Sequence, residues 1–193
     1  MDYHLRPATV ADAEPICHIY NQGIEDRLAT LETELRTPDE RRQWLSSRSP
    51  RHPVIVAIPE AAIPRTATKS RTEPTSTSNR PPTTIPEQAA PAPIAWASLN
   101  VFNARECYRF VADISVYVER QWRGKGAGRV LLERLIELGY EHEFHKLVLS
   151  AFPFNPGGMA LYERMGFRTV GVYKEQGRLD GRWVDTIVME RLL

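Results

Sequence analysis

The sequence has few of the residues that build disulfide frameworks or metal sites. It contains two cysteines, Cys17 and Cys107, no CxxC or HExxH motif, and five histidines that form no spaced cluster. Two cysteines cannot make a disulfide framework, and zinc sites need ligands at characteristic spacings. We therefore expect a protein of a reducing compartment, the cytoplasm, that holds no metal.

The sequence also lacks a charge excess and a long apolar run. Its 25 Lys and Arg residues nearly balance its 24 Asp and Glu residues, whereas proteins that bind nucleic acids or membrane surfaces normally carry a basic excess. No run approaches the roughly 18 apolar residues of a membrane span, and residues 1–14 contain no apolar segment of a secretory signal. We therefore expect neither nucleic acid nor membrane among the partners.

Residues 59–93 contain no aromatic side chain but hold eight of the fifteen prolines and seven threonines. A segment of this composition buries too little apolar area to offset its ordering entropy, and proline disfavours both helix and central strand. Long surface insertions cost little closure entropy. We predict that residues 1–193 form a single domain in which 59–93 is a disordered insertion.

Capping motifs and apolar periodicity predict the elements outside that insertion. Thr9 with Asp12, and Thr37 followed by Pro38, each indicate the start of a helix. Two further helices are expected at 126–143 and 157–165, and strands at 3–6, 53–58, 94–102, 108–118, 146–152, 168–174 and 183–192. This order predicts an α/β (α+β) fold with a mixed sheet of about seven strands and helices on both faces.

Glycine is nearly absent before residue 123, and ten of the eleven glycines follow it. Three of them lie in the turn 123–128, between a predicted strand and a predicted helix. Such a turn can hold a diphosphate, because its N–H groups and the helix dipole favour an anion and the missing Cβ atoms allow close approach. The dinucleotide motif GxGxxG is broken by Arg129, and the P-loop motif is absent. The remaining pattern, R-x-x-G-x-G, is also compatible with a turn that only connects two elements.

The sequence segments around this turn resemble the motifs of a known family. SVYVERQWRGKGAGRVLLERLI (115–136) and NPGGMALYERMGF (155–167) resemble motifs A and B of the Gcn5-related N-acetyltransferases, the GNAT family. Residues 5–21 resemble that family's opening strand and helix, so the resemblance covers the chain except 59–93. Segments 21–30, 108–118 and 170–193 are most similar to phosphinothricin and arsinothricin acetyltransferases. The resemblance implies a mostly antiparallel GNAT sheet, acetyl-CoA as donor, a small primary amine as acceptor, and a homodimer.

The turn and the strand before it provide the expected acetyl-CoA site. We expect the diphosphate on the backbone of the turn and the pantetheine arm on the exposed edge of the strand. The Val116 amide would polarise the thioester carbonyl. The resemblance adds that Asn155 contacts the pantetheine arm. The predicted cofactor-binding residues are Val116, Tyr117, Val118, Arg123, Gly124, Lys125, Gly126, Ala127, Gly128 and Asn155.

Two residues are predicted to move protons. Asp113 is an acid among apolar strand residues and is our candidate for accepting the proton of the attacking amine. The phosphinothricin-type relatives carry Glu at the matching position, so the shorter Asp113 favours relay through water. The resemblance implies that Tyr162 protonates the departing thiolate. The alternative for Asp113 is a carboxylate that only forms structural hydrogen bonds with the backbone or an Arg. The alternative for Tyr162 is packing within an amphipathic helix.

Three residues are predicted to bind the acceptor. Strand alternation would place Arg109 and Asp113 on one face, roughly 13 Å apart at about 3.3 Å per residue. That separation suits an amino acid whose acidic end meets Arg109 and Arg105 and whose amine meets Asp113. Glu32 lies in a segment that shapes the acceptor pocket in relatives. Solvated surface charge is the alternative for each of the three.

These residues predict an N-acetyltransferase that acetylates the α-amine of a small glutamate-like amino acid, with phosphinothricin, methionine sulfoximine and arsinothricin as candidates and detoxification as the outcome. One alternative is an enzyme of the same fold that acetylates a peptide N-terminus or a polyamine. The other is a non-catalytic CoA-binding module. A peptide acceptor favours an open acidic groove, whereas a small amino acid favours a closed pocket with Arg.

Overall fold

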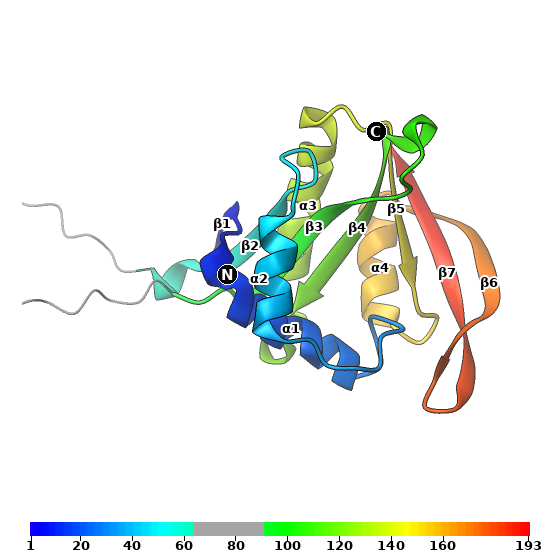
Figure 1. Ribbon diagram of the computed structural model, residues 1–193, viewed down its shortest axis with the longest axis horizontal. Helices are drawn as coiled ribbons and strands as arrows, with labels where there is room; N and C mark the ends of the chain where they lie inside the picture. Colours follow the sequence, from blue (N-terminus) through cyan, green and yellow to red (C-terminus); the bar gives the residue numbers. More distant parts are fainter. Residues whose placement is uncertain (64–90) are drawn as a thin grey trace, which may run out of the picture.

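The computed structural model describes residues 1–63 and 91–193 (Figure 1). In chain order the elements are β1 (Tyr3–Pro7), α1 (Ala13–Glu25), α2 (Pro38–Ser46), β2 (Val54–Pro59), β3 (Ala95–Val101), β4 (Val111–Val118), α3 (Ala127–Glu141), β5 (Lys146–Ala151), α4 (Pro156–Arg164), β6 (Arg168–Leu179) and β7 (Arg182–Leu192). Short 3-10 turns lie at Val10–Asp12, Glu60–Ala62, Glu106–Tyr108 and Arg120–Trp122. None of the described helices is both long and apolar enough to cross a membrane.

The seven strands form one mixed sheet in the order β1-β2-β3-β4-β5-β7-β6. Every neighbouring pair is antiparallel except β4 and β5, which run parallel. The predicted α/β class, the mixed and mostly antiparallel sheet and the order of elements are confirmed.

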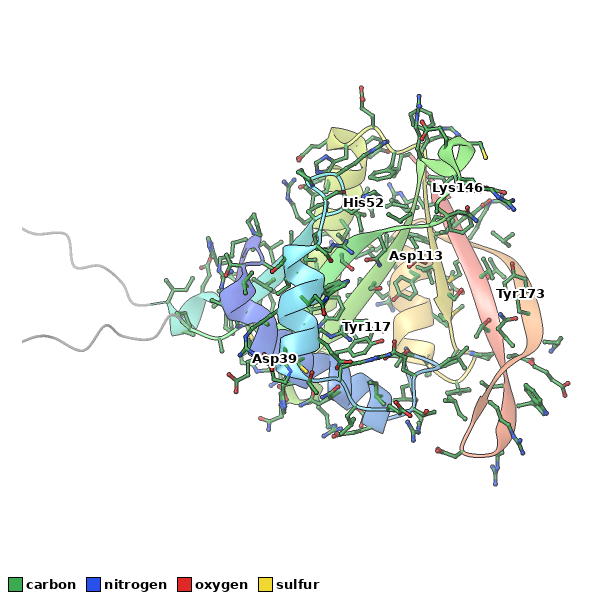
Figure 2. All side chains as sticks on the ribbon, viewed as in Figure 1. Asp39, His52, Asp113, Tyr117, Lys146 and Tyr173 are labelled. Carbon is green, nitrogen blue, oxygen red and sulfur yellow. The ribbon has the colours of Figure 1, made fainter. Side chains whose placement is uncertain are left out.

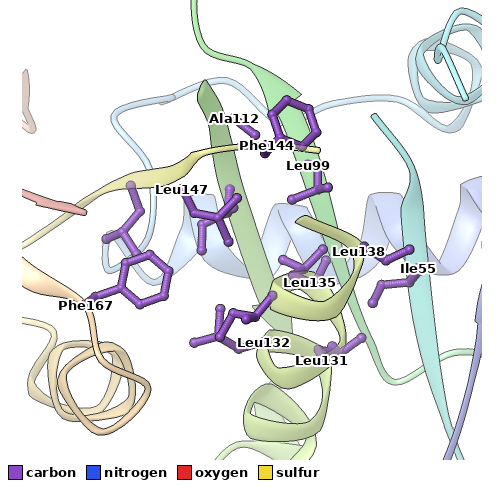
Figure 3. Packing of buried hydrophobic residues seen from close by; sticks show 14 of the residues in the cluster. Ile55, Leu99, Ala112, Leu131, Leu132, Leu135, Leu138, Phe144, Leu147 and Phe167 are labelled. Atoms are coloured by element: carbon purple, nitrogen blue, oxygen red, sulfur yellow. The ribbon is translucent and has the colours of Figure 1, made fainter. Parts of the chain in front are cut away.

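Strand alternation divides the core between the two faces of the sheet. Ile55 and Ala57 of β2 pack with α3 on one face, whereas Val54 and Val56 pack with α1 on the other. The larger cluster combines α3 leucines with side chains from β2 to β5 (Figure 3). Leu131, Leu135 and Leu138 of α3 follow one another at helical spacing, and all three are buried.

The predicted helix starts are also observed. Thr9 and Asp12 form a reciprocal capping box ahead of α1, and Thr37 and Glu40 form another at the start of α2. Asp12 additionally accepts two hydrogen bonds from Arg6 of β1, each 2.7 Å long. This pair fixes the first helix against the first strand.

The sheet separates between its two parallel strands. Strand β4 pairs with β5 only through Val111, Ala112 and Asp113, but pairs with β3 as far as Val118. The second half of β4 therefore has an edge that no strand covers. This opening is where the candidate site lies.

The strand predicted at 108–118 begins three residues later, at Val111, and that part of the prediction is wrong. Residues 106–108 form a 3-10 turn, closed by hydrogen bonds from the Tyr108 amide to Arg105 and from the Arg109 amide to Glu106. The β3 partner ends at Val101, opposite Ala112, so earlier residues have no strand to pair with on that side. Arg109 therefore does not share a strand face with Asp113.

The predicted insertion starts too early. Pro59 is the last residue of β2 and pairs with Tyr3, and Glu60–Ala62 forms a 3-10 turn. Proline is tolerated here because its nitrogen faces the β3 side, where the pairing of β2 with β3 has already ended at Ala57. Residues 64–90, which make up most of the predicted disordered insertion, lie outside the described residues.

Candidate active site

A cavity of about 860 Å³ lies against the second half of β4, the part that β5 does not pair with. Its walls come from the end of β4, the turn before α3 and the first residues of α3, helix α4, and the end of α1 with the segment after it. The lining residues are Gly23, Leu28, Ala29, Val116, Tyr117, Val118, Trp122, Arg123, Gly124, Gly126, Gly128, Arg129, Asn155, Gly157, Gly158, Ala160, Leu161, Tyr162, Arg164 and Met165.

The turn before α3 presents free backbone amides to this cavity. Gly126 caps the helix in a left-handed conformation (φ 95°) and offers no side chain to the first helical N–H groups. Within the described chain, the amides of Gly126, Ala127 and Gly128 have no hydrogen-bond acceptor. Cβ atoms added at Gly124 or Gly126 would meet nothing within 4 Å. Free amides, open space and a helix N-terminus fit a diphosphate.

The charged side chains of the turn are held away from its amides. Arg123 donates to Asp26 at 2.5 Å and to the Val118 carbonyl at 3.2 Å. The Lys125 ammonium lies 5.0 Å above the Trp122 ring. The pKa of the Asp26 carboxyl is lowered by hydrogen bonds from Arg120 and Arg123, which outweigh its partial burial. The free backbone amides are thus the main candidates for binding an anion at this turn.

The open edge of β4 carries the backbone groups of Val116 and Val118. The Glu119 amide donates to the Ile94 carbonyl at 2.9 Å, on the β3 side. Because N–H groups alternate along a strand, the amide of Tyr117 points to β3 and those of Val116 and Val118 point into the opening. The structure places both residues as the pantetheine prediction requires. Binding itself stays a prediction.

Asp113 lies where the pairing of β4 with β5 ends, and Figure 2 shows it midway along β4 with Tyr117 nearer the end of the strand. Burial raises the pKa of its carboxyl to about 6, and the amide of Asn100 opposes that rise with a contact of 3.5 Å. Among the described side chains, no Lys or Arg forms an ion pair with it. A carboxylate that titrates near neutrality is suited to accept a proton.

A partly buried polar network supports Asp113, and sequence reasoning missed it. The Asn100 side-chain amide also donates to Ser115 at 3.1 Å, while its oxygen accepts from Arg48 at 3.1 Å and from Ser98 at 3.0 Å. Arg48 donates in addition to the Leu99 carbonyl. Asn100 is the β3 partner of Asp113 in the sheet, and only this register brings them together.

Tyr162 projects from α4 into the cavity of about 860 Å³, whereas Asp113 is not among the described residues that line it. Burial, together with the negative charge of Asp113, raises the pKa of its phenol to about 12. The hydroxyl therefore keeps its proton at neutral pH and can donate it to charge that develops on a leaving group. Its ring packs edge-on against Phe167 at 6.0 Å, so the residue also contributes to packing.

Asn155 lines the cavity, but its side-chain amide already has partners. Its oxygen accepts from the Gly158 amide at 3.0 Å, which caps α4, and its nitrogen donates to the Leu28 carbonyl at 3.2 Å. The observed role is to join α4 to the segment after α1. A contact with the pantetheine arm stays a prediction.

The predicted acceptor residues are not brought together around the main cavity. Arg105 and Arg109 line a second cavity of about 170 Å³ with Arg51, His52 and Glu106, next to Val111 at the start of β4. Arg109 forms an ion pair with Glu106. Glu32 lies elsewhere, in an ion pair with Arg36 at 2.7 Å. Burial raises the pKa of Glu32, but the hydrogen bonds from Arg36 and Tyr20 and the nearby Arg charges together outweigh it, so the net shift is downward.

Tyr117 and several cavity residues have positions that the sequence does not predict. The Tyr117 ring stacks on Trp96 at 4.7 Å on the α1 face, opposite to the side chains of Val116 and Val118. Arg129 and Arg164 place two further cations on the cavity wall. Arg129 could have been found from its place in the first turn of α3, whereas Arg164 gives no such signal. No group of three or more potential metal ligands occurs in residues 1–63 or 91–193.

Comparison with known proteins finds one matching family and relatives of similar sequence. Residues 32–167 match the family "Acetyltransferase (GNAT) family". The phosphinothricin N-acetyltransferase of Streptomyces coelicolor is 27% identical over 192 residues, covering 100% of this chain and 97% of the relative.

Two solved structures have a similar fold. The GNAT superfamily phosphinothricin acetyltransferase from Sinorhizobium meliloti, in complex with acetyl-CoA, has a TM-score of 0.80 and 27% identity, covering 100% of this chain and 89% of that chain. The ribosomal-protein-alanine N-acetyltransferase from Brucella melitensis has a TM-score of 0.79 and 30% identity, covering 98% of this chain and 99% of that chain.

Proposed function

The chain belongs to the GNAT acetyltransferase family and is an acetyl-CoA-dependent N-acetyltransferase, and on this premise we propose that its acceptor is the α-amine of a small glutamate-like amino acid. When bound, acetyl-CoA supplies the acetyl group as a thioester. The observation that carries the proposal is Asp113, a carboxylate with a pKa of about 6 at the opening between β4 and β5.

The proposed roles of the residues follow from their positions. Asp113 accepts a proton from the ammonium form of the acceptor, directly or through water, so that the neutral amine attacks the thioester carbon. The Val116 amide donates to the carbonyl oxygen as negative charge develops there. Tyr162 donates its proton to the sulfur as the carbon–sulfur bond breaks. The amides of Gly126, Ala127 and Gly128 bind the diphosphate.

The second cavity supports an acceptor with an acidic end. It adjoins Val111, two residues before Asp113, and three Arg side chains line it. Arg109 is paired with Glu106, so we assign Arg105 the main contact with the acidic group and Arg109 a secondary one. Glu32 stays a candidate on the acceptor side.

An Arg105→Ala variant is expected to raise KM for acidic acceptors and leave KM for acetyl-CoA unchanged.

The substrate proposal is tested by a free-thiol assay with acetyl-CoA and a panel of amines. The panel contains phosphinothricin, methionine sulfoximine, arsinothricin, glutamate, a polyamine and a peptide with N-terminal alanine. We expect the highest kcat/KM with the glutamate analogues. Preference for the polyamine or the peptide would reject this acceptor class while leaving the N-acetyltransferase activity intact.

One observation favours a second acceptor. The ribosomal-protein-alanine N-acetyltransferase is 30% identical over nearly the whole chain, and its name specifies an alanine of a ribosomal protein. The peptide in the panel represents this class. If the chain binds CoA and acetylates no amine in the panel, the alternative of a non-catalytic CoA-binding module gains support.

We also propose that the enzyme detoxifies its acceptor and works as a homodimer. Expression in a bacterium sensitive to phosphinothricin tests the detoxification proposal, with the Asp113→Asn variant as control.

The homodimer proposal is supported by large apolar side chains of β6 and β7 that are exposed: Val170, Val172, Tyr173 and Trp183. Light scattering during size-exclusion chromatography measures the mass, and a monomer at micromolar concentration would contradict the dimer.

A further inference from the structure

The Lys125–Gly126 peptide is held by a residue from the other end of the chain. The Tyr3 hydroxyl of β1 donates to the Lys125 carbonyl at 2.8 Å. Its other neighbour, the Met1 sulfur, is farther away at 3.5 Å. The Tyr3 ring also meets the Trp122 ring edge-on, with centroids 6.4 Å apart. A side chain of the first strand thus reaches the anion-binding turn.

Peptide geometry links this hydrogen bond to the cavity. In a trans peptide, the C=O of one residue and the N–H of the next point in opposite directions within one plane. A Lys125 carbonyl directed at Tyr3 therefore turns the Gly126 amide away from β1. Gly126 lines the cavity, and its amide has no acceptor in the described chain.

The turn needs such a constraint because of its composition. Gly124 and Gly126 both have positive φ, 75° and 95°, and glycine accepts both signs of φ at little cost. Nothing in the covalent structure of this segment prevents the 125–126 peptide from flipping. A flipped peptide would present a carbonyl oxygen, instead of an amide hydrogen, to the bound anion.

We propose that Tyr3 is a positioning residue for acetyl-CoA binding: its hydroxyl holds the Lys125 carbonyl so that the Gly126 amide faces the diphosphate. The proposal depends on the use of acetyl-CoA and is independent of the acceptor. Failure of the acceptor proposal would leave it untouched. Its own failure would leave the acceptor proposal untouched as well.

The test compares Tyr3→Phe, which removes only the hydroxyl, with the unmodified protein. Calorimetric titration with CoA is expected to give an affinity about three- to tenfold weaker, as expected for one lost hydrogen bond. With acetyl-pantetheine as donor, which has no diphosphate, kcat/KM is expected to stay unchanged. Tyr140→Phe is the matched control, because this exposed hydroxyl at the far end of α3 has no partner among the described residues.

The two donors separate positioning from general destabilisation. Weaker binding of CoA with unchanged use of acetyl-pantetheine supports the proposal. Equal losses with both donors, or CoA affinity equal to that of Tyr140→Phe, would overturn it. Unfolding in urea, followed for both variants, shows whether β1 still docks. A Tyr3→Phe protein of normal stability and normal CoA affinity also rejects the proposal.

Discussion

Among single residues, Asp113 gives the most direct link between burial of a side chain and a proposed chemical role. Its pKa is raised from 3.8 to about 6 because it is largely buried without a cation. Only the ionised form accepts a proton, so we expect kcat/KM to increase with pH up to about 6 and to be lost below it. Asp113→Asn should reduce kcat about 10²- to 10⁴-fold. A profile that is flat between pH 5 and 7 would contradict this role.

The same shift predicts the stability of that variant. A carboxyl whose folded pKa is raised favours the folded state at low pH, and this contribution is lost as pH rises through about 6. At pH 8 the buried charge destabilises the fold. Asp113→Asn should therefore be more stable than the unmodified protein at pH 8, by about 1–2 kcal/mol. Asp113→Glu keeps the charge and the general base, and serves as the control in urea unfolding.

Asn100 should influence the apparent pKa below which kcat/KM is lost, the acid limb of the pH profile. Its side-chain amide donates to Asp113 and stabilises the ionised form. Asn100→Ala removes that donor, so the apparent pKa of the acid limb should move above about 6. Ser98→Ala is a matched control, because Ser98 contacts Asn100 without contacting Asp113. Equal acid limbs in the two variants would show that Asn100 does not tune the base.

Single elements differ in how well the sequence predicts them. Capping boxes at Thr9 and Thr37 place α1 and α2 correctly, because a cap depends on residues three positions apart. Tyr108 and Phe110 have high strand propensity, but β4 pairs with β5 only from Val111 and with β3 only from Ala112. Whether such residues form a strand depends on a partner, which local propensity does not contain.

The same reason limits prediction of the site. The Gly-rich turn, the Val116 edge and Tyr162 can be predicted, because each belongs to one contiguous motif. Asn100 cannot, because it reaches Asp113 only through the pairing of β3 with β4, and Arg48 cannot, because it supports Asp113 only through Asn100. Tyr3 contacts Lys125 across 122 residues of sequence. Sequence patterns identify local chemistry, whereas the supporting contacts depend on the completed sheet.

The turn before α3 should be sensitive to any residue with a Cβ. Gly126 has a φ of 95°, which costs an L-residue roughly 1–2 kcal/mol, although its Cβ would meet no atom. Gly126→Ala should lower the free energy of unfolding by about that amount and weaken CoA binding. Gly171→Ala is the control, because its Cβ also meets open space and its φ is not positive. Equal stabilities would show that strain at Gly126 is absent.

On the scale of the whole molecule, described residues on both sides of 64–90 pair β2 with its neighbours β1 and β3. Ala57 pairs with Ala95, and the Ile94 amide donates to the Ala57 carbonyl at 2.9 Å. The Glu60 amide donates to the Asp2 carbonyl at 3.1 Å, which fixes the chain after β2 against the start of β1. The register of the sheet is therefore set by residues on either side of the segment.

We expect that replacing residues 64–90 by an eight-residue Gly/Ser link leaves kcat/KM unchanged. Shortening the connection lowers the entropy cost of closing it, so the free energy of unfolding should rise by about 1 kcal/mol. A Gly/Ser link of the original length is the control, because it changes the composition and keeps the length. Loss of activity in both variants would mean that residues 64–90 contribute to catalysis, whereas loss with the short link alone would mean that β2 and β3 need the longer connection.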